Sequence, residues 1–343
     1  MKGQTNRTYL ITDEVYKKYF TGITDVEGVL LHGKTDVYFI DARYYFEAQE
    51  KYKDTDVKFV LYKGLNSIKD YLLENDVKTV YINFDTVSVT EFKKYKTLGV
   101  KLKDGSLLLK KIRSKKNGVE LSKIKKSCKI AQKVCLDTIT GLTEGVSELQ
   151  VKEKINKALL SYGCTPSFDT IVAFGKNSAI PHHQSDGTVL TKESCVLIDM
   201  GANFNGYASD ITRTAYFGVN PSKEFLSVYN AVLTANKSVI ETVKAGMDYS
   251  YAHTLASDVL KKYGYEKAFT HSLGHGLGLE IHEYPSLSIA SKGRLINGQT
   301  FTVEPGAYFD GKFGVRIEDT VVMKKSKINR LFTDDKELII IKP

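Results

Sequence analysis

The chain has 343 residues, of which 42% are hydrophobic and 26% charged, and its formal net charge is +9. This composition is that of a soluble globular protein, and the length allows two domains with a sizeable core. No apolar run approaches the roughly 20 residues that cross a bilayer, and residues 1–10 contain no apolar signal core. These features exclude a membrane-spanning helix and favour a cytoplasmic protein without a membrane partner.

The positive net charge could indicate a nucleic-acid-binding protein. Lysines cluster shortly before Asn117, and the members of this cluster are Lys101, Lys103, Lys110, Lys111, Lys115 and Lys116. They are scattered through alternating apolar sequence, and no nucleic-acid-binding motif accompanies them. We therefore interpret the cluster as a solvated face and interdomain linker, and we expect no nucleic-acid partner.

The first third of the chain alternates short β-like runs with helical stretches. Strands are predicted at residues 28–31, 37–40, 57–61 and 79–82, and a helix at 67–73. This pattern predicts an α/β unit with a mixed sheet. The basic segment 110–117 is the best boundary, so we expect two domains, residues 1–112 and 113–343.

Four helices are predicted in the second domain. The first covers residues 119–140 and has apolar residues at 121, 124, 128, 131, 134, 135 and 139. The second runs from Ser147 to Tyr162, with Ser147 as N-cap and Gln150 three positions later. Two more helices are expected at about 223–244 and 249–263. The four cysteines contain no Cys-x-x-Cys pair and are interpreted as reduced core residues.

Two acidic residues belong to a first predicted hairpin. Asp199 lies in an apolar run that begins at Cys195, Asp210 precedes a run that ends at Phe217, and turn-prone residues 201–206 lie between them. If the turn centres on residues 204 and 205, Asp199 and Asp210 face each other directly. Paired Cβ atoms on one face lie roughly 5 Å apart. Two such carboxylates repel strongly unless cations lie between them.

A second hairpin repeats this construction. Glu304 lies in the run 301–309, Glu318 lies in the run 313–322, and a turn is expected at Asp310-Gly311. The two glutamates are symmetric about Gly311. Facing acids at buried-looking positions would be costly in a purely structural sheet, so the two hairpins predict a metal site.

A glycine-rich stretch supplies an imidazole to the same candidate site. His275 lies between Gly274 and Gly276, and three of the seven histidines, at 271, 275 and 282, fall within twelve positions. Ser286 stands four residues after His282, which excludes a His-Glu-x-x-His zinc helix. Four carboxylates and one imidazole form a hard, oxygen-rich ligand set that suits manganese, cobalt or iron.

Several strings in the second half of the chain carry a family resemblance. They are Leu-Ile-Asp-Met-Gly, Ser-Asp-Ile-Thr-Arg-Thr, His-Ser-Leu-Gly-His-Gly-Leu-Gly-Leu-Glu-Ile-His-Glu, Thr-Val-Glu-Pro-Gly and Val-Arg-Ile-Glu-Asp-Thr. From about residue 120 onward the chain resembles the pita-bread metallopeptidases, and among them the Xaa-Pro aminopeptidases and prolidases. Residues 19–23 and 39–44 resemble the smaller creatinase-type domain of these proteins. The resemblance implies an α+β fold, a creatinase-like domain at 1–112, a pita-bread catalytic domain at 113–343, and a homodimer.

The resemblance also implies a role for each candidate ligand. Two divalent ions are expected, with manganese first and cobalt, iron or zinc as alternatives. Asp199 would bind one ion, His275 and Glu304 the other, and Asp210 and Glu318 would bridge both. Water shared by two such ions becomes a nucleophile near neutral pH. Glu304 would carry its proton to the leaving proline nitrogen.

Further residues are expected around the reacting bond. By resemblance, His182 and His282 face the substrate, His271 is a third candidate, and Arg316 organises the site through charge-assisted hydrogen bonds. The alternative for Arg316 is a structural ion pair. His183 is expected to face solvent.

The substrate prediction depends on one departure from the family pattern. Some prolidase-like relatives have an arginine directly after the His-Glu-x-Pro string, where it could hold a dipeptide carboxylate, and this chain has Ser286. We therefore favour an Xaa-Pro aminopeptidase that cleaves short peptides with proline at the second position. The alternatives are an Xaa-Pro dipeptidase (prolidase), a methionine aminopeptidase, and a catalytically inactive binding protein of the same fold.

Overall fold

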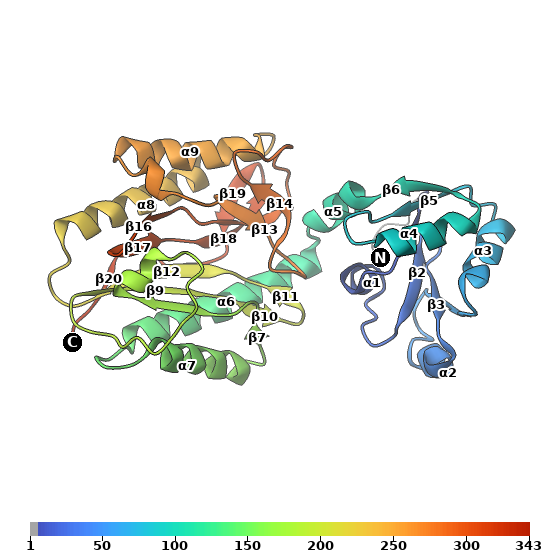
Figure 1. The fold of residues 1–343 in the computed structure, drawn as a ribbon, viewed down its shortest axis with the longest axis horizontal. Coiled ribbons are helices and arrows are strands. Elements are labelled where there is room, and N and C mark those ends of the chain that lie inside the picture. Colours follow the sequence, from blue (N-terminus) through green and yellow to red (C-terminus); the bar gives the residue numbers. More distant parts are fainter. Residues whose placement is uncertain (1–5) are drawn as a thin grey trace. The chain divides into compact units, whose positions relative to one another are not determined.

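The structure is a computed structural model that describes residues 6–343. The chain divides into two compact units, Met1–Arg113 and Ser114–Pro343 (Figure 1). The expected absence of a signal core at residues 1–10 falls partly on residues outside the described ones. Within residues 6–343, no helix has the length and apolar character needed to span a membrane.

The first unit is built on a six-stranded mixed sheet with the order β4-β3-β2-β1-β5-β6. Its strands are β1 (Thr8–Ile11), β2 (Gly28–His32), β3 (Val37–Ile40), β4 (Lys58–Leu61), β5 (Thr79–Ile82) and β6 (Lys101–Asp104). Its helices are α1 (Glu14–Thr21), α2 (Ala42–Lys51), α3 (Leu65–Glu74), α4 (Val89–Tyr95), the 3-10 turn η1 (Lys96–Leu98) and α5 (Ser106–Ser114). β1 pairs antiparallel with β2 and parallel with β5, which confirms the predicted mixed sheet.

Apolar side chains cover both faces of this sheet. In β3, Tyr38 and Ile40 join one buried cluster, whereas Val37 and Phe39 join another, because successive side chains of a strand point to opposite faces. The predicted strands and the predicted helix of this unit are confirmed. β1 and β6 were not predicted; β6 is an edge strand, and its exposed lysines 101 and 103 give it little apolar character.

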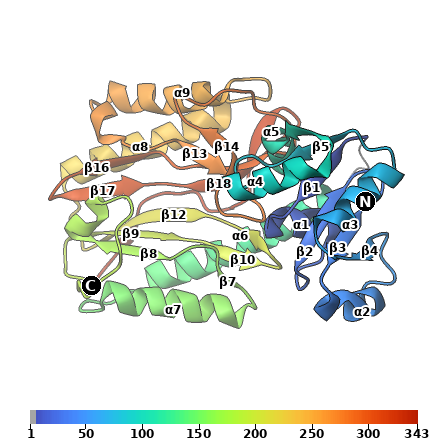
Figure 2. The same cartoon turned by 45° about the vertical axis from the view of Figure 1, so that its right-hand side comes forward.

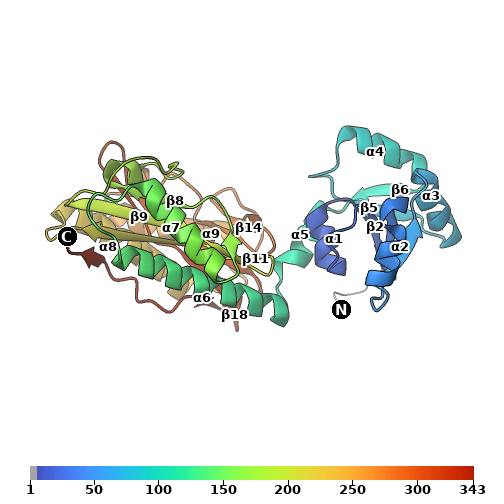
Figure 3. The same cartoon turned by 90° about the horizontal axis from the view of Figure 1, so that it is seen from below.

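The second unit packs two layers of paired helices against several sheets, whose strand pairs are antiparallel except for the parallel pair β12–β20. Figures 1 and 2 show α8 and α9 on one side of the strands and α6 and α7 on the other; Figure 3 shows α6 and α7 from below. The helices are α6 (Gly118–Thr140), α7 (Glu148–Ser161), η2 (Gly175–Ala179), α8 (Lys223–Thr242), α9 (Tyr249–Lys262) and η3 (Glu266–Ala268). All four predicted α-helices are confirmed, and Ser147 with Gln150 forms the expected capping box at α7.

The strands of this unit form four sheets. A four-stranded sheet has the order β20-β12-β9-β8, a five-stranded sheet β14-β13-β15-β18-β19, a three-stranded sheet β11-β10-β7, and β16 pairs with β17. The strands are β7 (Thr165–Pro166), β8 (Ile171–Phe174), β9 (Ser194–Met200), β10 (Ala202–Phe204), β11 (Tyr207–Ala208), β12 (Ile211–Phe217), β13 (Gly274–Gly276), β14 (Glu283–Leu287), β15 (Thr300–Val303), β16 (Gly306–Phe309), β17 (Phe313–Arg316), β18 (Asp319–Lys324), β19 (Lys327–Arg330) and β20 (Ile339–Ile341). One core cluster joins α6 and α7 to the four-stranded sheet, and another joins α8 and α9 to the five-stranded sheet. This architecture confirms the α+β class.

The register predicted for the first hairpin is wrong by two residues. Asp199 pairs with Thr212, and Ile211 pairs with Met200, so Asp210 does not lie directly opposite Asp199. The turn consists of Asn205 and Gly206, which have φ angles of 50° and 80°. Asn-Gly is the preferred pair for a type I′ turn, in which both φ angles are positive. A shift of two residues keeps side chains on the same face of the strand, so both carboxylates still face one side.

The register predicted for the second hairpin is confirmed. Val303 pairs with Asp319 at one end of the β15–β18 ladder, and Gly306 pairs with Arg316 at one end of the β16–β17 ladder. Glu304 and Glu318 lie in the interruption between these ladders. Gly311, with a φ of 69°, lies in the connecting turn as expected.

The segment interpreted as a solvated linker is only partly solvent-exposed. Lys111 and Lys115 are exposed as predicted, and α5 extends through the segment to Ser114. The prediction is wrong for Lys116, whose ammonium is buried and forms an ion pair with Glu283 in β14. A buried lysine is rare unless it is paired, and Glu283 supplies the partner. The four cysteines are free and buried, as expected.

Candidate metal centre and active site

One cavity of the second unit, with a volume of about 470 Å³, brings together every predicted site residue. The polar part of its lining includes His182, Asp199, Asp210, His271, His275, His282, Glu304, Arg316 and Glu318, together with Asp169 and Ser272. Phe168, Ile171, Pro181 and Ile281 supply an apolar wall. The cavity can therefore hold a small polar group beside an apolar one.

The five candidate ligands come from strand ends and strand interruptions. Asp199 lies in β9, Asp210 directly precedes β12, and His275 lies in β13. The amide of Glu318 donates to the carbonyl of Thr212 at 3.1 Å, and the amide of Glu304 donates to the carbonyl of Leu273 at 2.9 Å. These two bonds connect the second hairpin to the strands that carry the other ligands.

The donor atoms of these residues converge. His275 Nε2 lies 3.5 Å from Asp210 Oδ2 and 3.3 Å from Glu304 Oε1. Ligand atoms of Asp210, His275 and Glu318 all lie within 4.8 Å of one another. Among the described residues, the buried carboxylate oxygens without a hydrogen-bond partner are Asp199 Oδ1, Asp210 Oδ1 and Glu318 Oε1. Buried polar atoms rarely lack partners, and these oxygens fit divalent cations, which prefer oxygen ligands.

The pKa shifts of the candidate ligands follow from their burial and from the charges of their neighbours. Burial raises the pKa of Asp210 and of Glu318 well above the usual range, and neighbouring carboxylates add to both shifts. Burial also raises the pKa of Glu304 to about 8. Burial lowers the pKa of His275 to about 4, so its imidazole is neutral and able to bind a cation.

Arg316 connects a candidate ligand to two residues that sequence analysis missed. Its Nη2 forms an ion pair with Asp199 Oδ2 at 2.7 Å, and its Nε donates to Thr212 Oγ1 at 3.0 Å. Its Nη1 donates to the hydroxyl of Tyr308 at 2.7 Å. Thr212 in turn donates to Glu318 Oε2 at 2.7 Å. Thr212 lies inside the string Ser-Asp-Ile-Thr-Arg-Thr, whereas Tyr308 lies in an apolar strand and gives no sequence signal.

His271 and His282 are held differently in the cavity. Burial lowers the pKa of His271 to about 4. Its Nδ1 lies 2.8 Å from the carbonyl of Ser272, and its Nε2 lies 3.0 Å from the Tyr308 hydroxyl. Because a carbonyl only accepts, Nδ1 carries the proton and Nε2 accepts from Tyr308. The ring of His282 packs edge-on against that of His275, with centroids 4.3 Å apart.

The prediction that His183 faces solvent is wrong. Its side chain is 9% exposed, and its Nε2 lies 2.7 Å from Glu148 Oε2. His182 is the exposed member of the pair and lines the cavity. The two histidines lie at a turn in which the amide of His183 donates to the carbonyl of Ile180 at 3.1 Å, and their imidazoles have different surroundings: the cavity for His182 and Glu148 for His183.

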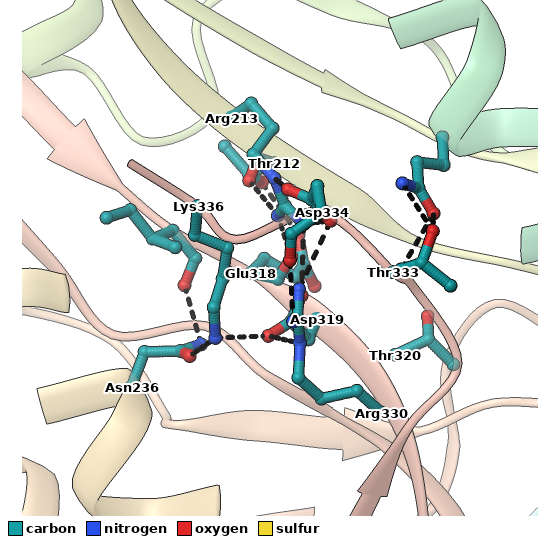
Figure 4. A network of polar contacts seen from close by, with 12 residues as sticks. Thr212, Arg213, Asn236, Glu318, Asp319, Thr320, Arg330, Thr333, Asp334 and Lys336 are labelled. Atoms are coloured by element: carbon teal, nitrogen blue, oxygen red, sulfur yellow. Dashed lines mark hydrogen bonds and ion pairs between the residues drawn. The ribbon is translucent and has the colours of Figure 1, made fainter. Parts of the chain in front are cut away.

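A network of buried charges lies directly behind Glu318. Asp319 Oδ1 accepts from Arg213 Nη2 at 3.0 Å, and Asp319 Oδ2 accepts from Arg330 at 2.9 Å and from Lys336 at 2.8 Å (Figure 4). Arg213 also donates to the carbonyls of Thr212 and Glu318. The network thus binds the backbone of two strands that face the cavity.

Comparisons with known proteins agree with this geometry. The pattern of metallopeptidase family M24 matches residues 122–325, and that of the creatinase/prolidase N-terminal domain matches residues 1–115. The Xaa-Pro dipeptidase of Pyrococcus furiosus is 35% identical over 324 residues, which cover 94% of this chain and 92% of that protein.

Solved structures show the same architecture over nearly the whole chain. The Xaa-Pro dipeptidase from Bacillus anthracis has a TM-score of 0.89 and 32% identity, covering 97% of this chain and 95% of that chain. The X-Pro aminopeptidase from Thermotoga maritima has a TM-score of 0.87 and 30% identity, covering 98% of this chain and 97% of that chain. The chain therefore belongs to metallopeptidase family M24, and it is a hydrolase with a pita-bread fold preceded by a creatinase/prolidase N-terminal domain.

Proposed function

We propose that the protein is an Xaa-Pro dipeptidase (prolidase) that depends on two divalent metal ions. The observation that carries this proposal is the near full-length similarity to relatives named Xaa-Pro dipeptidase, together with a cavity that holds all five candidate ligands. The sequence favoured an aminopeptidase because of Ser286 alone. The comparisons favour the alternative, since two relatives that match over 94% of the chain are named Xaa-Pro dipeptidase, and similar solved structures are named prolidase.

The proposed ligands are Asp199, Asp210, His275, Glu304 and Glu318. Their unpartnered oxygens and neutral imidazole support a hard divalent cation, and manganese is the expected ion, with cobalt, iron and zinc as alternatives. When bound, two such ions would lower the pKa of water and polarise the scissile carbonyl. The proposal keeps the domains predicted at residues 1–112 and 113–343 and the expected homodimer.

The remaining polar cavity residues would act on the peptide or hold the groups that do. His182 and His282 line the cavity, and they would donate hydrogen bonds to the oxygen of the scissile carbonyl as it gains negative charge. Glu304 would transfer a proton to the proline nitrogen, which must be protonated to leave. Arg316 would hold Asp199 in place, and His271, whose two nitrogens are engaged by Ser272 and Tyr308, would position neighbouring groups.

A pair of matched peptides tests the proposal. We expect metal-stripped protein with manganese restored to cleave an Xaa-Pro dipeptide, and Glu304→Ala to lower kcat by at least about a hundredfold. The control is Glu153→Gln, an exposed residue of α7, which should retain activity. Cleavage of an Xaa-Pro-Yaa tripeptide but not of the dipeptide would reject the dipeptidase proposal.

The second candidate is an Xaa-Pro aminopeptidase. It is favoured by Ser286 and by the similarity to the Thermotoga maritima X-Pro aminopeptidase. The tripeptide result described above would establish it. Asp210→Asn distinguishes both enzymes from an inactive binding protein, because an enzyme should lose turnover with its fold retained.

A further inference from the structure

We propose that Glu148 is a positioning residue for His182. Glu148 is the first residue of α7, its side chain is fully buried, and it does not line the cavity. Sequence analysis gave it no role. The inference rests on the proposed function, because it requires that His182 acts on the substrate.

The Glu148 carboxylate accepts four hydrogen bonds from one loop. Oε1 accepts from the amide of Phe174 at 2.8 Å and from Asn177 Nδ2 at 2.9 Å. Oε2 accepts from the amide of Asp186 at 3.0 Å and lies 2.7 Å from His183 Nε2. These donors come from both ends of the loop 174–186 and from its interior. One carboxylate therefore fixes the whole loop.

His182 is held between two anchored neighbours. The ring of His183 is bound by Glu148 on one side. The carbonyl of Pro181 accepts from Arg316 Nη1 at 3.4 Å on the other. The loop that carries His182 is thus fixed from α7 and from the strand that carries Arg316. This arrangement sets the direction from which His182 enters the cavity.

The backbone near Glu148 reinforces this attachment. The amide of Glu148 donates to the carbonyl of Thr188 at 3.0 Å, and the amide of Leu149 donates to that of Asp186 at 3.1 Å. Glu148 also lies in the first turn of a 14-residue helix, where the helix dipole favours a negative charge. The carboxylate of Glu148 can accept all four hydrogen bonds. The side-chain amide of a glutamine would instead direct its NH2 group at two of the four donors.

The test compares Glu148→Gln with the exposed control Glu153→Gln on the same helix. We expect Glu148→Gln in the manganese-loaded protein to lower kcat/KM for an Xaa-Pro dipeptide by about 10- to 100-fold, because a small displacement of a catalytic group is enough for this loss. Manganese affinity, measured by calorimetry, should stay unchanged. His183→Ala, which removes one donor, should show a smaller loss and serves if Glu148→Gln does not fold.

A double-mutant cycle distinguishes positioning from general stability. In a His182→Ala background, Glu148→Gln should cause no further loss of kcat/KM, since both changes act through one group. A full additional loss there, or unchanged activity in the otherwise wild-type protein, would overturn the inference.

Failure of the proposed function has a different signature. Wild-type protein without turnover, or a fully active His182→Ala variant, would reject the proposed role of His182 and with it the positioning. Hydrogen exchange tests the attachment of the loop to Glu148 without any measurement of activity. The Phe174 and Asp186 amides should exchange faster in Glu148→Gln than in Glu153→Gln. Equal exchange rates would contradict the anchoring as well.

Discussion

At the residue scale, the cavity combines carboxylates that repel one another with a neutral imidazole. Asp199, Asp210 and Glu318 each keep one buried oxygen without a hydrogen-bond partner among the described residues. This arrangement is unfavourable in a protein that only needs to fold, and it is the usual cost of a site that must bind cations.

Thr212 connects the candidate ligand Glu318 with Arg316 through one hydroxyl. We expect Thr212→Val, which keeps the shape and removes the hydroxyl, to weaken metal binding or activity by about 10- to 100-fold. Calorimetric titration with manganese measures the change in affinity. The control is Thr140→Val at the exposed end of α6, and equal affinities for the two variants would contradict the role of Thr212.

Removal of one ligand charge should stabilise the metal-free protein. Asp210→Asn relieves repulsion from Glu318 and Asp199, which both raise the pKa of Asp210. We expect the free energy of unfolding in a chelating buffer to rise by about 1–3 kcal/mol, while peptide cleavage is lost. Urea denaturation measures the first effect, and a decrease in stability would show that Asp210 has a structural partner.

At the element scale, three of the five candidate ligands lie where strands are interrupted or begin, and not inside a regular ladder. Glu304 and Glu318 lie where two ladders break, and Asp210 directly precedes β12. Because neither glutamate belongs to a ladder, their side chains can converge on one point. The backbone hydrogen bond from Glu318 to Thr212 then fixes the distance between the two strands.

The buried charges of Figure 4 support these elements from behind. Asp319 faces Arg213, Arg330 and Lys336, and these cations hold the pKa of Asp319 at about 2 despite its burial. We expect Asp319→Asn to lower the free energy of unfolding by about 3–5 kcal/mol, because it leaves buried cations unpaired. Thermal denaturation measures this loss, and Asp335→Asn, an exposed neighbour, should have little effect.

Periodicity and capping predicted the four α-helices of the second unit and the two hairpins of the candidate ligands, whereas several elements of the first unit, among them α1, α2, α4, α5 and β1, were not predicted. Ser147 with Gln150 defined the start of α7, and symmetry about Gly311 gave the correct second register. The first register was wrong because the turn was centred on residues 204 and 205, although Asn-Gly at 205 and 206 favours a type I′ turn. β6 was missed because an edge strand rich in lysine lacks an apolar pattern.

At the scale of the whole molecule, the metal centre joins two halves of the second unit. Asp199 belongs to the sheet packed on α6 and α7, whereas His275 belongs to the sheet packed on α8 and α9. That the nine candidate site residues line one cavity was predictable, because they lie in short strings with unusual residue types. Tyr308 and Glu148 were not, since their roles arise only from tertiary contacts.

The stability of the metal-free protein should depend on pH. Burial raises the pKa of Glu304 from 4.5 to about 8, so the folded state binds a proton more tightly than the unfolded state. The contribution of Glu304 to stability should therefore rise as the pH falls from about 8 towards 4.5, and decrease in the opposite direction. Melting temperatures in a chelating buffer measure this trend, and Glu304→Gln should flatten it.

The position of the last ligand also has a consequence for biosynthesis. Glu318 follows Asp199 by more than a hundred residues, and β20 adds to the edge of β12 only after residues 339–341 have been made. The first unit contains its own core and can fold while the rest of the chain is being translated. The proposed ligand set, in contrast, is complete only after Glu318 has been made. Binding of metal by all five proposed ligands must therefore follow synthesis of the chain through Glu318.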